Sequence, residues 1–170
     1  MKVRNETIQD HAAISTIHRE AFKNDPHREP GTGPTEHLIV EELRADHALT
    51  LSLVAETKEG VVGHIAMSPT TIGTTSKDWF ILGPVGVLPD HQGQGIGSAL
   101  VREALASMRA NGAHGIVLVG DPSFYERFGF RSLDRITYPG VPQQFVLALP
   151  WTDDIPTGDI VHNKAFFAGR

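Results

Sequence analysis

The feature that most constrains this fold is a run of three glycines at alternate positions within residues 93–97. An apolar segment, residues 79–88, precedes the run and has the β-branched and aromatic composition of a strand. Residues 97–111 follow with leucine, valine, alanine and methionine at helical spacing, and an Asn-Gly pair ends the pattern. The sequence therefore predicts a strand, a glycine loop and a helix in direct succession.

A loop of this kind favours an anion, above all a phosphate or pyrophosphate. Glycine lets the backbone approach a ligand closely and turn its amide groups toward it. The first turn of the following helix adds N–H groups without intrahelical partners and the positive end of the helix dipole. We expect the backbone amides after the strand to hold the phosphate while a glutamine orders the loop. The predicted binding residues of the loop are Gln92, Gly93, Gln94, Gly95, Ile96, Gly97 and Ser98.

Two known phosphate-binding arrangements fit the loop less well. A P-loop is excluded because no Gly-Lys-Ser/Thr follows the glycines. A dinucleotide fold is a closer rival, since Asp121 ends the next strand where a ribose-binding acid would lie. However, the glycines are spaced Gly-x-Gly-x-Gly, and too few residues follow Asp121 for repeated βα units. A nucleotide-binding oxidoreductase is therefore the weaker interpretation.

Periodicity along the rest of the chain predicts one domain spanning residues 1–170, with a mixed sheet between helices. A break at Gly83-Pro84 predicts a bulge or a splayed strand end, because proline cannot donate to a sheet ladder. One further strand is left open at each end of the chain. The other predicted elements are helices at 10–22 and 35–45, a hairpin of 50–56 and 61–67, a strand at 116–119, a short helix at 121–129 and a strand near 144–149.

Composition excludes several classes of protein. The chain is 40% hydrophobic with a net charge of −5, which indicates an ordinary globular domain and argues against nucleic-acid binding. It has neither an apolar run of about 20 residues nor a signal-peptide pattern, so we expect no membrane partner and a cytoplasmic location. It has no cysteine, and its nine histidines lack the spacing of metal ligands, so we expect no metal.

Two segments together resemble a known family. Residues 92–97, Gln-Gly-Gln-Gly-Ile-Gly, resemble the acetyl-CoA signature Gln/Arg-x-x-Gly-x-Gly/Ala of the GNAT N-acetyltransferases, and residues 85–89 resemble the strand leading into it. Residues 125–130, Tyr-Glu-Arg-Phe-Gly-Phe, resemble the second landmark of that family, a tyrosine four residues before Gly-Phe. Both lie within residues 79–130 in the order of the family. The sequence departs at residues 120–123, Gly-Asp-Pro-Ser, where many members have an asparagine that contacts the pantetheine arm.

The resemblance implies both a fold and a reaction. The fold is the α/β (α+β) GNAT or acyl-CoA N-acyltransferase fold, a mixed, mostly antiparallel sheet of six to seven strands with a central splayed pair and helices on both faces. The reaction is direct transfer of an acetyl group from acetyl-CoA to a primary amine. An acyl-CoA-binding sensor or regulatory module, which keeps the loop without the chemistry, is the alternative function.

The resemblance also implies roles for three residues beyond the loop. Backbone groups of Val85 and Val87 would hold the pantetheine arm like an added strand, and the Val87 N–H would stabilise the thioester oxygen. Tyr125 would bind near the thiol and act as the general acid. A phenol with an ordinary pKa of about 10 can protonate a thiolate whose conjugate acid has a pKa of about 8.5.

The general base stays open. His64 alternates with apolar residues on its strand, so we interpret it as a satisfied core histidine rather than a base. Glu56 lies at a strand end, and Glu36, Glu41 and Glu42 lie on the second helix, where the family builds its acceptor pocket. We interpret each as a solvated charge, and a water chain would serve equally well as the base.

The acceptor and the tail also stay open. The amine acceptor is a small molecule or a protein, and a homodimer is compatible with the chain because dimers are the commonest assemblies. Arg102, Arg109 and Arg127 are candidates for the 3′-phosphate of CoA or simply exposed helix residues. Residues 151–170 mix acidic and aromatic side chains. They are candidates for closing the acceptor side or a subunit interface, and packing against the domain is the default interpretation.

Overall fold

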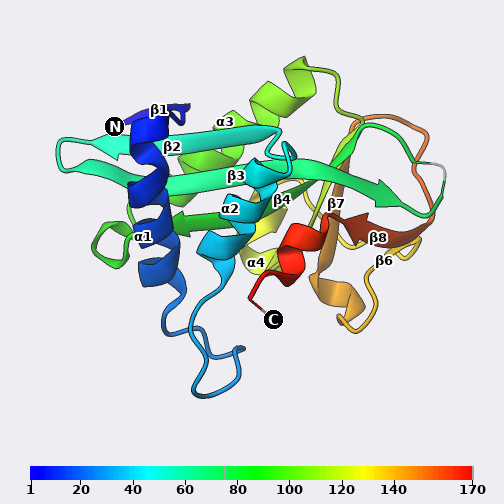
Figure 1. The fold of residues 1–170 in the computed structure, drawn as a ribbon. Coiled ribbons are helices and arrows are strands. Elements are labelled where there is room, and N and C mark those ends of the chain that lie inside the picture. The colour runs from blue at the N-terminus through cyan, green and yellow to red at the C-terminus, as the bar shows by residue number, and fades with distance from the viewer. Residues whose placement is uncertain (75, 170) are drawn as a thin grey trace.

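The computed structural model describes residues 1–74 and 76–169, and these residues form one eight-stranded mixed sheet (Figure 1). The strand order is β1-β2-β3-β4-β5-β7, while β8 pairs with β3 and β6 pairs with β8. All neighbours are antiparallel except β4 with β5 and β6 with β8. The strands are β1 (Lys2–Asn5), β2 (Leu51–Thr57), β3 (Gly60–Ile72), β4 (Trp79–Val87), β5 (Gly115–Val119), β6 (Ile136–Thr137), β7 (Val146–Pro150) and β8 (Gly158–His162).

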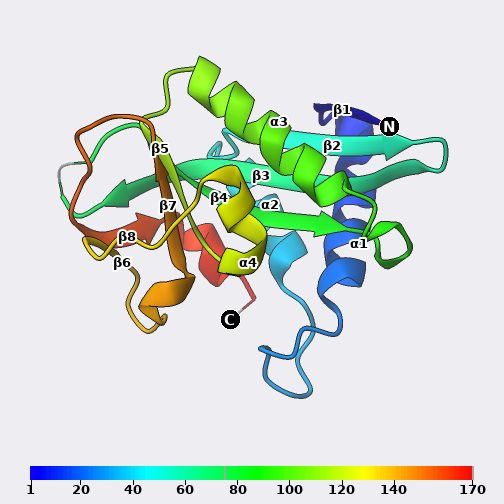
Figure 2. The same cartoon turned by 180° about the vertical axis from the view of Figure 1, so that it is seen from behind.

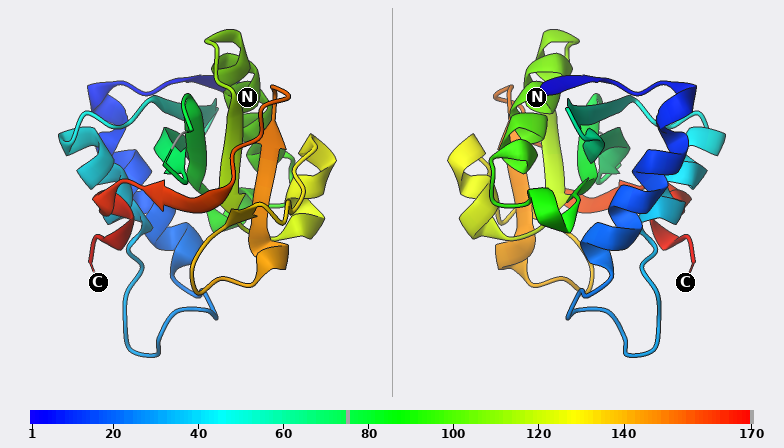
Figure 3. Two further views of the ribbon diagram at one scale, coloured as in Figure 1. Left: turned by 90° about the vertical axis from the view of Figure 1, so that its right-hand side faces the viewer. Right: turned by 90° about the vertical axis from the view of Figure 1, so that its left-hand side faces the viewer.

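Helices cover both faces of the sheet. Helices α1 (His11–Phe22) and α2 (Glu36–Ala45) lie on one face, and α3 (Ile96–Ala110) and α4 (Pro122–Tyr125) lie on the other (Figures 2 and 3). The apolar stripe of α3 explains its place, because six of its residues are buried against the main core. None of the helices in the described residues is long and apolar enough to cross a bilayer.

The sheet opens between β4 and β5. The two strands pair in parallel only where Trp79–Ile81 faces Gly115–Val117. Beyond Ile81, β4 continues to Val87 paired only with β3, whereas β5 stays paired with β7. The register between β3 and β4 also shifts between Ile65 and Met67. The predicted splayed pair is therefore confirmed, and it begins next to the Gly-Pro break.

The predicted fold class is confirmed, with eight strands rather than six to seven. The extra pairing comes from the tail, because β8 aligns His162 with Thr70 and extends the far end of β3. Glycines permit this close approach. A Cβ at Gly158 would lie 2.6 Å from the Cα of Gly73, and both have positive φ. The turn after β8 leads into a short 3-10 helix, η5 (Lys164–Phe167), which packs on α2.

Candidate active site

The glycine loop turns sharply between β4 and α3. Gly93 and Gly95 have φ angles of 76° and 82°, in the left-handed region that glycine adopts without strain. Gly95 is the N-cap of α3, so the unpaired amides of the first helical turn open onto the loop. The side-chain amide of Gln92 donates to the carbonyl oxygen of Val87 at 2.9 Å and links the loop to the end of β4.

Backbone groups of β4 face the opening in the sheet. The amide of Leu88 donates to the carbonyl of Val62, so Leu88 belongs to the ladder with β3. The carbonyl of Val87 points the other way, because it accepts from the side chain of Gln92. Backbone groups of alternate residues in a strand face the same edge. Val85 and Val87 therefore both turn their N–H and C=O groups toward the side that β5 has left.

Three pockets follow one another from the loop along β4. The first, about 340 Å³, lies against the loop with Phe124 and Arg127 on its wall. The second, about 230 Å³, shares Gly97 and Phe124 with the first. The third, about 530 Å³, shares Phe22 and Val85 with the second and reaches the gap between β4 and β5. The shared lining residues place the three pockets next to one another, from the glycine loop along β4 to the splayed strands.

Tyr125 lines the third pocket. It is the last residue of α4, whose N-cap Asp121 accepts a hydrogen bond from the backbone of Ser123 at 2.9 Å. Its ring packs edge-on against Phe124 and Phe130, with centroids 4.9 and 5.9 Å away. Burial raises the pKa of the Tyr125 hydroxyl to about 12, because the phenolate would lose its hydration.

The third pocket, here called the acceptor pocket, combines acidic and aromatic side chains. Glu36 at the start of α2 lines it, together with Asp121. Tyr138, His162 and Phe166 also line it. These last three come from the segments after α4 and were not predicted as site residues. The lining therefore combines two carboxylates, aromatic side chains and the Tyr125 phenol.

The other carboxylates considered as bases lie elsewhere. Glu41 and Glu42 are exposed on α2 and do not line the acceptor pocket. Glu56 forms an ion pair with Arg4, whose nitrogen lies 3.3 Å from the carboxylate, on the β1–β2 side of the sheet. Of the four glutamates, the structure brings only Glu36 to the pocket, and it is half-buried there.

One arginine of the three lies at the glycine loop. Arg127 lines the first pocket, with its guanidinium carbon 4.9 Å from the centre of the Phe124 ring. Arg102 stacks over Phe128, and Arg109 stacks over Trp151 at 5.7 Å. Neither lines that pocket. Arg127 is therefore the cation best placed for a phosphate beside the loop.

His64 is the satisfied core histidine that its strand pattern predicts. It is 0% exposed, and both ring nitrogens are hydrogen-bonded. Its Nδ1 lies 2.8 Å from His18 Nε2, and its Nε2 lies 2.8 Å from the hydroxyl of Ser52. Ser52 in turn bonds to the carboxylate of Glu6. We call Glu6, Ser52, His64 and His18 the buried histidine chain.

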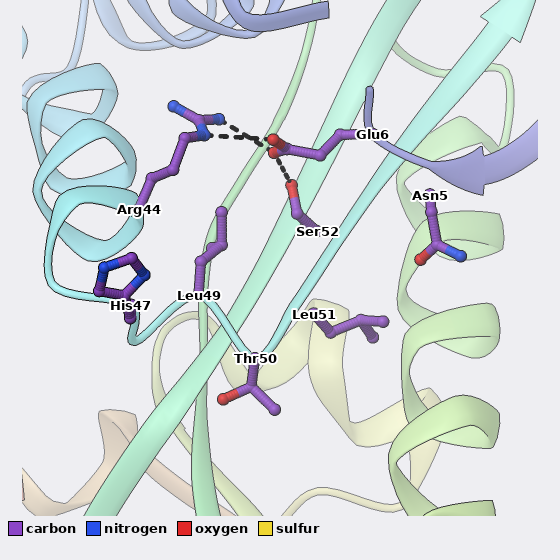
Figure 4. Close-up of a pocket in the computed structure, with 8 residues that line it drawn as sticks. All are labelled: Asn5, Glu6, Arg44, His47, Leu49, Thr50, Leu51 and Ser52. Carbon is purple, nitrogen blue, oxygen red and sulfur yellow. Dashed lines mark hydrogen bonds and ion pairs between the residues drawn. The ribbon is translucent and has the colours of Figure 1, made fainter. Parts of the chain in front are cut away.

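The buried histidine chain ends at a separate pocket of about 430 Å³ (Figure 4). Glu6 points between Ser52 and Arg44, and an Arg44 nitrogen lies 2.9 Å from the carboxylate. His11 lies 2.9 Å from the same group. These contacts lower the pKa of Glu6 against the opposing effect of its burial, which by itself raises the pKa. Within the described residues, no cluster of three acidic or histidine side chains is arranged to hold a metal ion.

The comparisons with known proteins agree with this geometry. Residues 49–132 match the model of the acetyltransferase (GNAT) domain. The Escherichia coli K12 protein YhbS, described as an uncharacterized N-acetyltransferase, is 34% identical over 150 residues, which are 85% of this chain and 84% of that protein. The chain belongs to the GNAT acetyltransferase family.

Two solved GNAT structures resemble the whole chain. A GNAT family acetyltransferase from Brucella melitensis, in complex with acetyl-CoA, is 43% identical with a TM-score of 0.84 and 97% of each chain covered. E. coli YhbS in complex with CoA is 30% identical with a TM-score of 0.85, covering 99% of this chain and 93% of that one. The match to the acetyltransferase (GNAT) domain ends at residue 132, so Tyr138 and His162 lie in the part of the chain that follows the match.

Proposed function

We propose that this GNAT protein transfers an acetyl group from acetyl-CoA to a primary amine by direct attack of the amine nitrogen. The observation that carries the proposal is the row of three adjoining pockets along β4. The row has an anion site of backbone amides at one end, and Tyr125 beside two carboxylates at the other. A binding module needs the first end of this row but not the second.

The donor half fits acetyl-CoA by its chemistry. The amides at the start of α3, with Arg127 nearby, match the pyrophosphate and the phosphate charge of the nucleotide end. The backbone groups of Val85 and Val87 match the amide groups of the pantetheine arm. The acetyl-CoA and CoA complexes of the two relatives support the same ligand for this chain.

Tyr125 and Val87 are proposed to do the chemistry at the thioester. The N–H of Val87 would stabilise negative charge on the carbonyl oxygen as the amine attacks. Tyr125 would protonate the departing sulfur. Its pKa of about 12 keeps the phenol protonated throughout the neutral pH range, so the hydroxyl always has a proton to donate.

The acceptor pocket favours a small cationic amine. The carboxylates of Glu36 and Asp121 attract an ammonium group, and the aromatic wall suits an apolar or aromatic body behind it. The volume of about 530 Å³ is that of a small-molecule site. We therefore favour a small amine over a protein chain as the acceptor.

The test is a thiol-release assay with acetyl-CoA and a panel of primary amines, comparing the wild type with Tyr125→Phe. We expect turnover of at least one amine, and a kcat about 10²-fold lower in the variant, in the range of general-acid effects. The Kd for acetyl-CoA, measured by calorimetry, should stay within about twofold, because the ring and its packing remain.

Two outcomes would contradict the proposal. If acetyl-CoA binds the wild type but no amine causes thiol release, the chain is a binding module rather than an enzyme. If Tyr125→Phe turns over at the wild-type rate, another group protonates the thiolate, and the role of Tyr125 is removed while the transfer reaction stands.

A further inference from the structure

Tyr138 and His162 meet on the wall of the acceptor pocket. Tyr138 follows β6, His162 ends β8, and these two strands pair in parallel. The hydroxyl oxygen of Tyr138 lies 2.5 Å from Nε2 of His162. Both residues are half-buried and line the pocket that Tyr125 also lines. We call Tyr138 and His162 the pocket pair.

The hydrogen bonds of His162 orient the pair. Nδ1 lies 3.1 Å from the backbone carbonyl oxygen of Asn163, and a carbonyl can only accept, so Nδ1 carries the hydrogen. Nε2 of the neutral ring is then a lone pair, and it accepts the hydrogen of the Tyr138 hydroxyl. When the Tyr138 oxygen takes up a proton, its own hydroxyl proton can therefore pass to Nε2 of His162 without rotation of either ring.

The surroundings hold His162 in this position. The alignment of His162 with Thr70 ties it to the long strand β3. Phe166 and Phe167 flank its ring, with centroids 4.6 and 5.2 Å away. The side chain of Asn163 accepts from the backbone of Ala165 at 2.8 Å and fixes the peptide that anchors Nδ1. The imidazole is thus preorganised on a sheet and capped by a short helix.

Other groups in the molecule suit the role of base less well. His18 and His64 are 0% exposed, and neither lines the acceptor pocket. Asp121 accepts two hydrogen bonds from Ser123, at 2.9 Å each, as the cap of α4. Glu36 is the one other titratable carboxylate facing this pocket from α2, and its charge suits binding of the ammonium form.

We propose that the pocket pair is the proton acceptor of the reaction, an inference that rests on the proposed acetyl transfer. The bound ammonium ion first gives one proton to solvent, which frees the nitrogen lone pair. As the neutral amine nitrogen bonds to the acetyl carbon, the Tyr138 oxygen takes a second proton from that nitrogen and gives its own proton to Nε2 of His162. Tyr125 gives its proton to the sulfur as the carbon–sulfur bond breaks. His162 then releases its proton to water, Tyr125 regains one, and the products are an amide and a thiol.

The experiment compares kcat and the amine KM for the wild type, Tyr138→Phe and His162→Gln, with an amine that the wild type acetylates. We expect kcat of His162→Gln to fall about 10²-fold near pH 7, the lower part of the range for general-base effects. The kcat of Tyr138→Phe, which keeps the ring, should also fall. His114→Gln, a half-exposed histidine that does not line the pocket, is the matched control and should keep the wild-type kcat.

The pH profile separates a proton acceptor from a structural residue. The difference in kcat between the wild type and His162→Gln should become smaller as the pH rises from 7 to 9.5, because hydroxide can then remove the proton from the amine nitrogen. The Kd for acetyl-CoA should stay within about twofold in both variants, which also shows that they fold. Two variants guard against the failure of one of them to fold.

Each result has one meaning. A kcat within about twofold of the wild type in both variants, or a loss that is the same at every pH, would overturn the role of the pocket pair. If the wild-type kcat falls at low pH, and this fall is lost in Glu36→Gln but kept in His162→Gln, the base is Glu36 instead. A wild type that releases no thiol with any amine would overturn the proposed function itself, so the two failures are distinguishable.

Discussion

The molecule holds two histidine systems that follow the same hydrogen-bond logic in different surroundings. In the buried histidine chain the ionised Glu6 can only accept, so Ser52 donates to it, His64 donates to Ser52, and His18 donates to His64. In the pocket pair the Asn163 carbonyl fixes the tautomer in the same way. In both systems an acceptor at one end dictates which ring nitrogens carry a hydrogen.

The two systems differ in burial, and burial decides what an imidazole can do. Desolvation, with a smaller effect of the nearby His37, lowers the pKa of His18 to about 3. Desolvation, with His18 and Arg44, lowers the pKa of His64 well below its ordinary value. Both rings are neutral at pH 7 and no substrate reaches them. The pocket pair, by contrast, faces a cavity that an amine can enter.

The buried histidine chain should make the fold acid-sensitive, and this is the largest effect we expect. His18 and His64 take up protons in the unfolded chain near pH 6.5 but not in the folded one, so stability is present above that pH and is lost as the pH falls. Between pH 7 and 5 the loss is about 2 kcal/mol for each ring, or about 4 kcal/mol for both. Urea unfolding at several pH values measures it.

The control for this prediction removes one ring of the buried histidine chain. His64→Gln, or His18→Gln if that variant fails to fold, should lose about half as much stability between pH 7 and 5 as the wild type. Carboxylates change the stability in a lower pH window. Arg4 lowers the pKa of Asp10 to about 2, so the stability that ionised Asp10 provides is lost only as the pH falls below about 4. A free energy of unfolding that is constant from pH 7 to 5 would contradict the prediction.

Deleting one hydroxyl from each system should give unequal losses of stability. Ser52→Ala leaves the buried N–H of His64 without its acceptor, and the free energy of unfolding should fall by about 1–3 kcal/mol. Tyr138→Phe removes the donor to His162 where water can take its place, so the loss should stay below about 1 kcal/mol. Urea unfolding at pH 7.5 measures both. Equal losses would show that burial does not separate the two systems.

The contrast also explains what the sequence could predict. The geometry of the proposed donor site was predictable because its parts are local: backbone amides of consecutive residues 92–98, and Tyr125 at a fixed distance from Gly-Phe. The alternation around His64 was enough to identify a buried histidine, and the structure confirms it. Its partner His18 was not identified, because helical spacing on α1 marks His18 only as a residue on the covered face.

The lining of the proposed acceptor pocket was only partly predictable, because distant segments build it. His162 reaches the pocket only when β8 pairs with β3, about ninety residues earlier, and no local pattern specifies that partner. The alternation of buried Ile160 with exposed Val161 is the one local signal for β8, and it carries no information on the pocket. The family resemblance pointed to the helix that carries Glu36, Glu41 and Glu42, but it did not distinguish between them. The fold brings only Glu36 to the pocket that Tyr125 lines.

The smallest effect we expect lies at the anchor of the pocket pair. Asn163→Ala removes the side-chain cap of η5 but keeps the backbone carbonyl that holds His162. N-cap deletions at partly exposed sites cost about 0.5–1 kcal/mol, so urea unfolding should show a loss of this size, and Asn163→Asp should restore most of it because a carboxylate accepts the same bond. A loss above about 2 kcal/mol would mean that the cap supports more than its own turn, and that the pocket pair is held as firmly as the buried histidine chain.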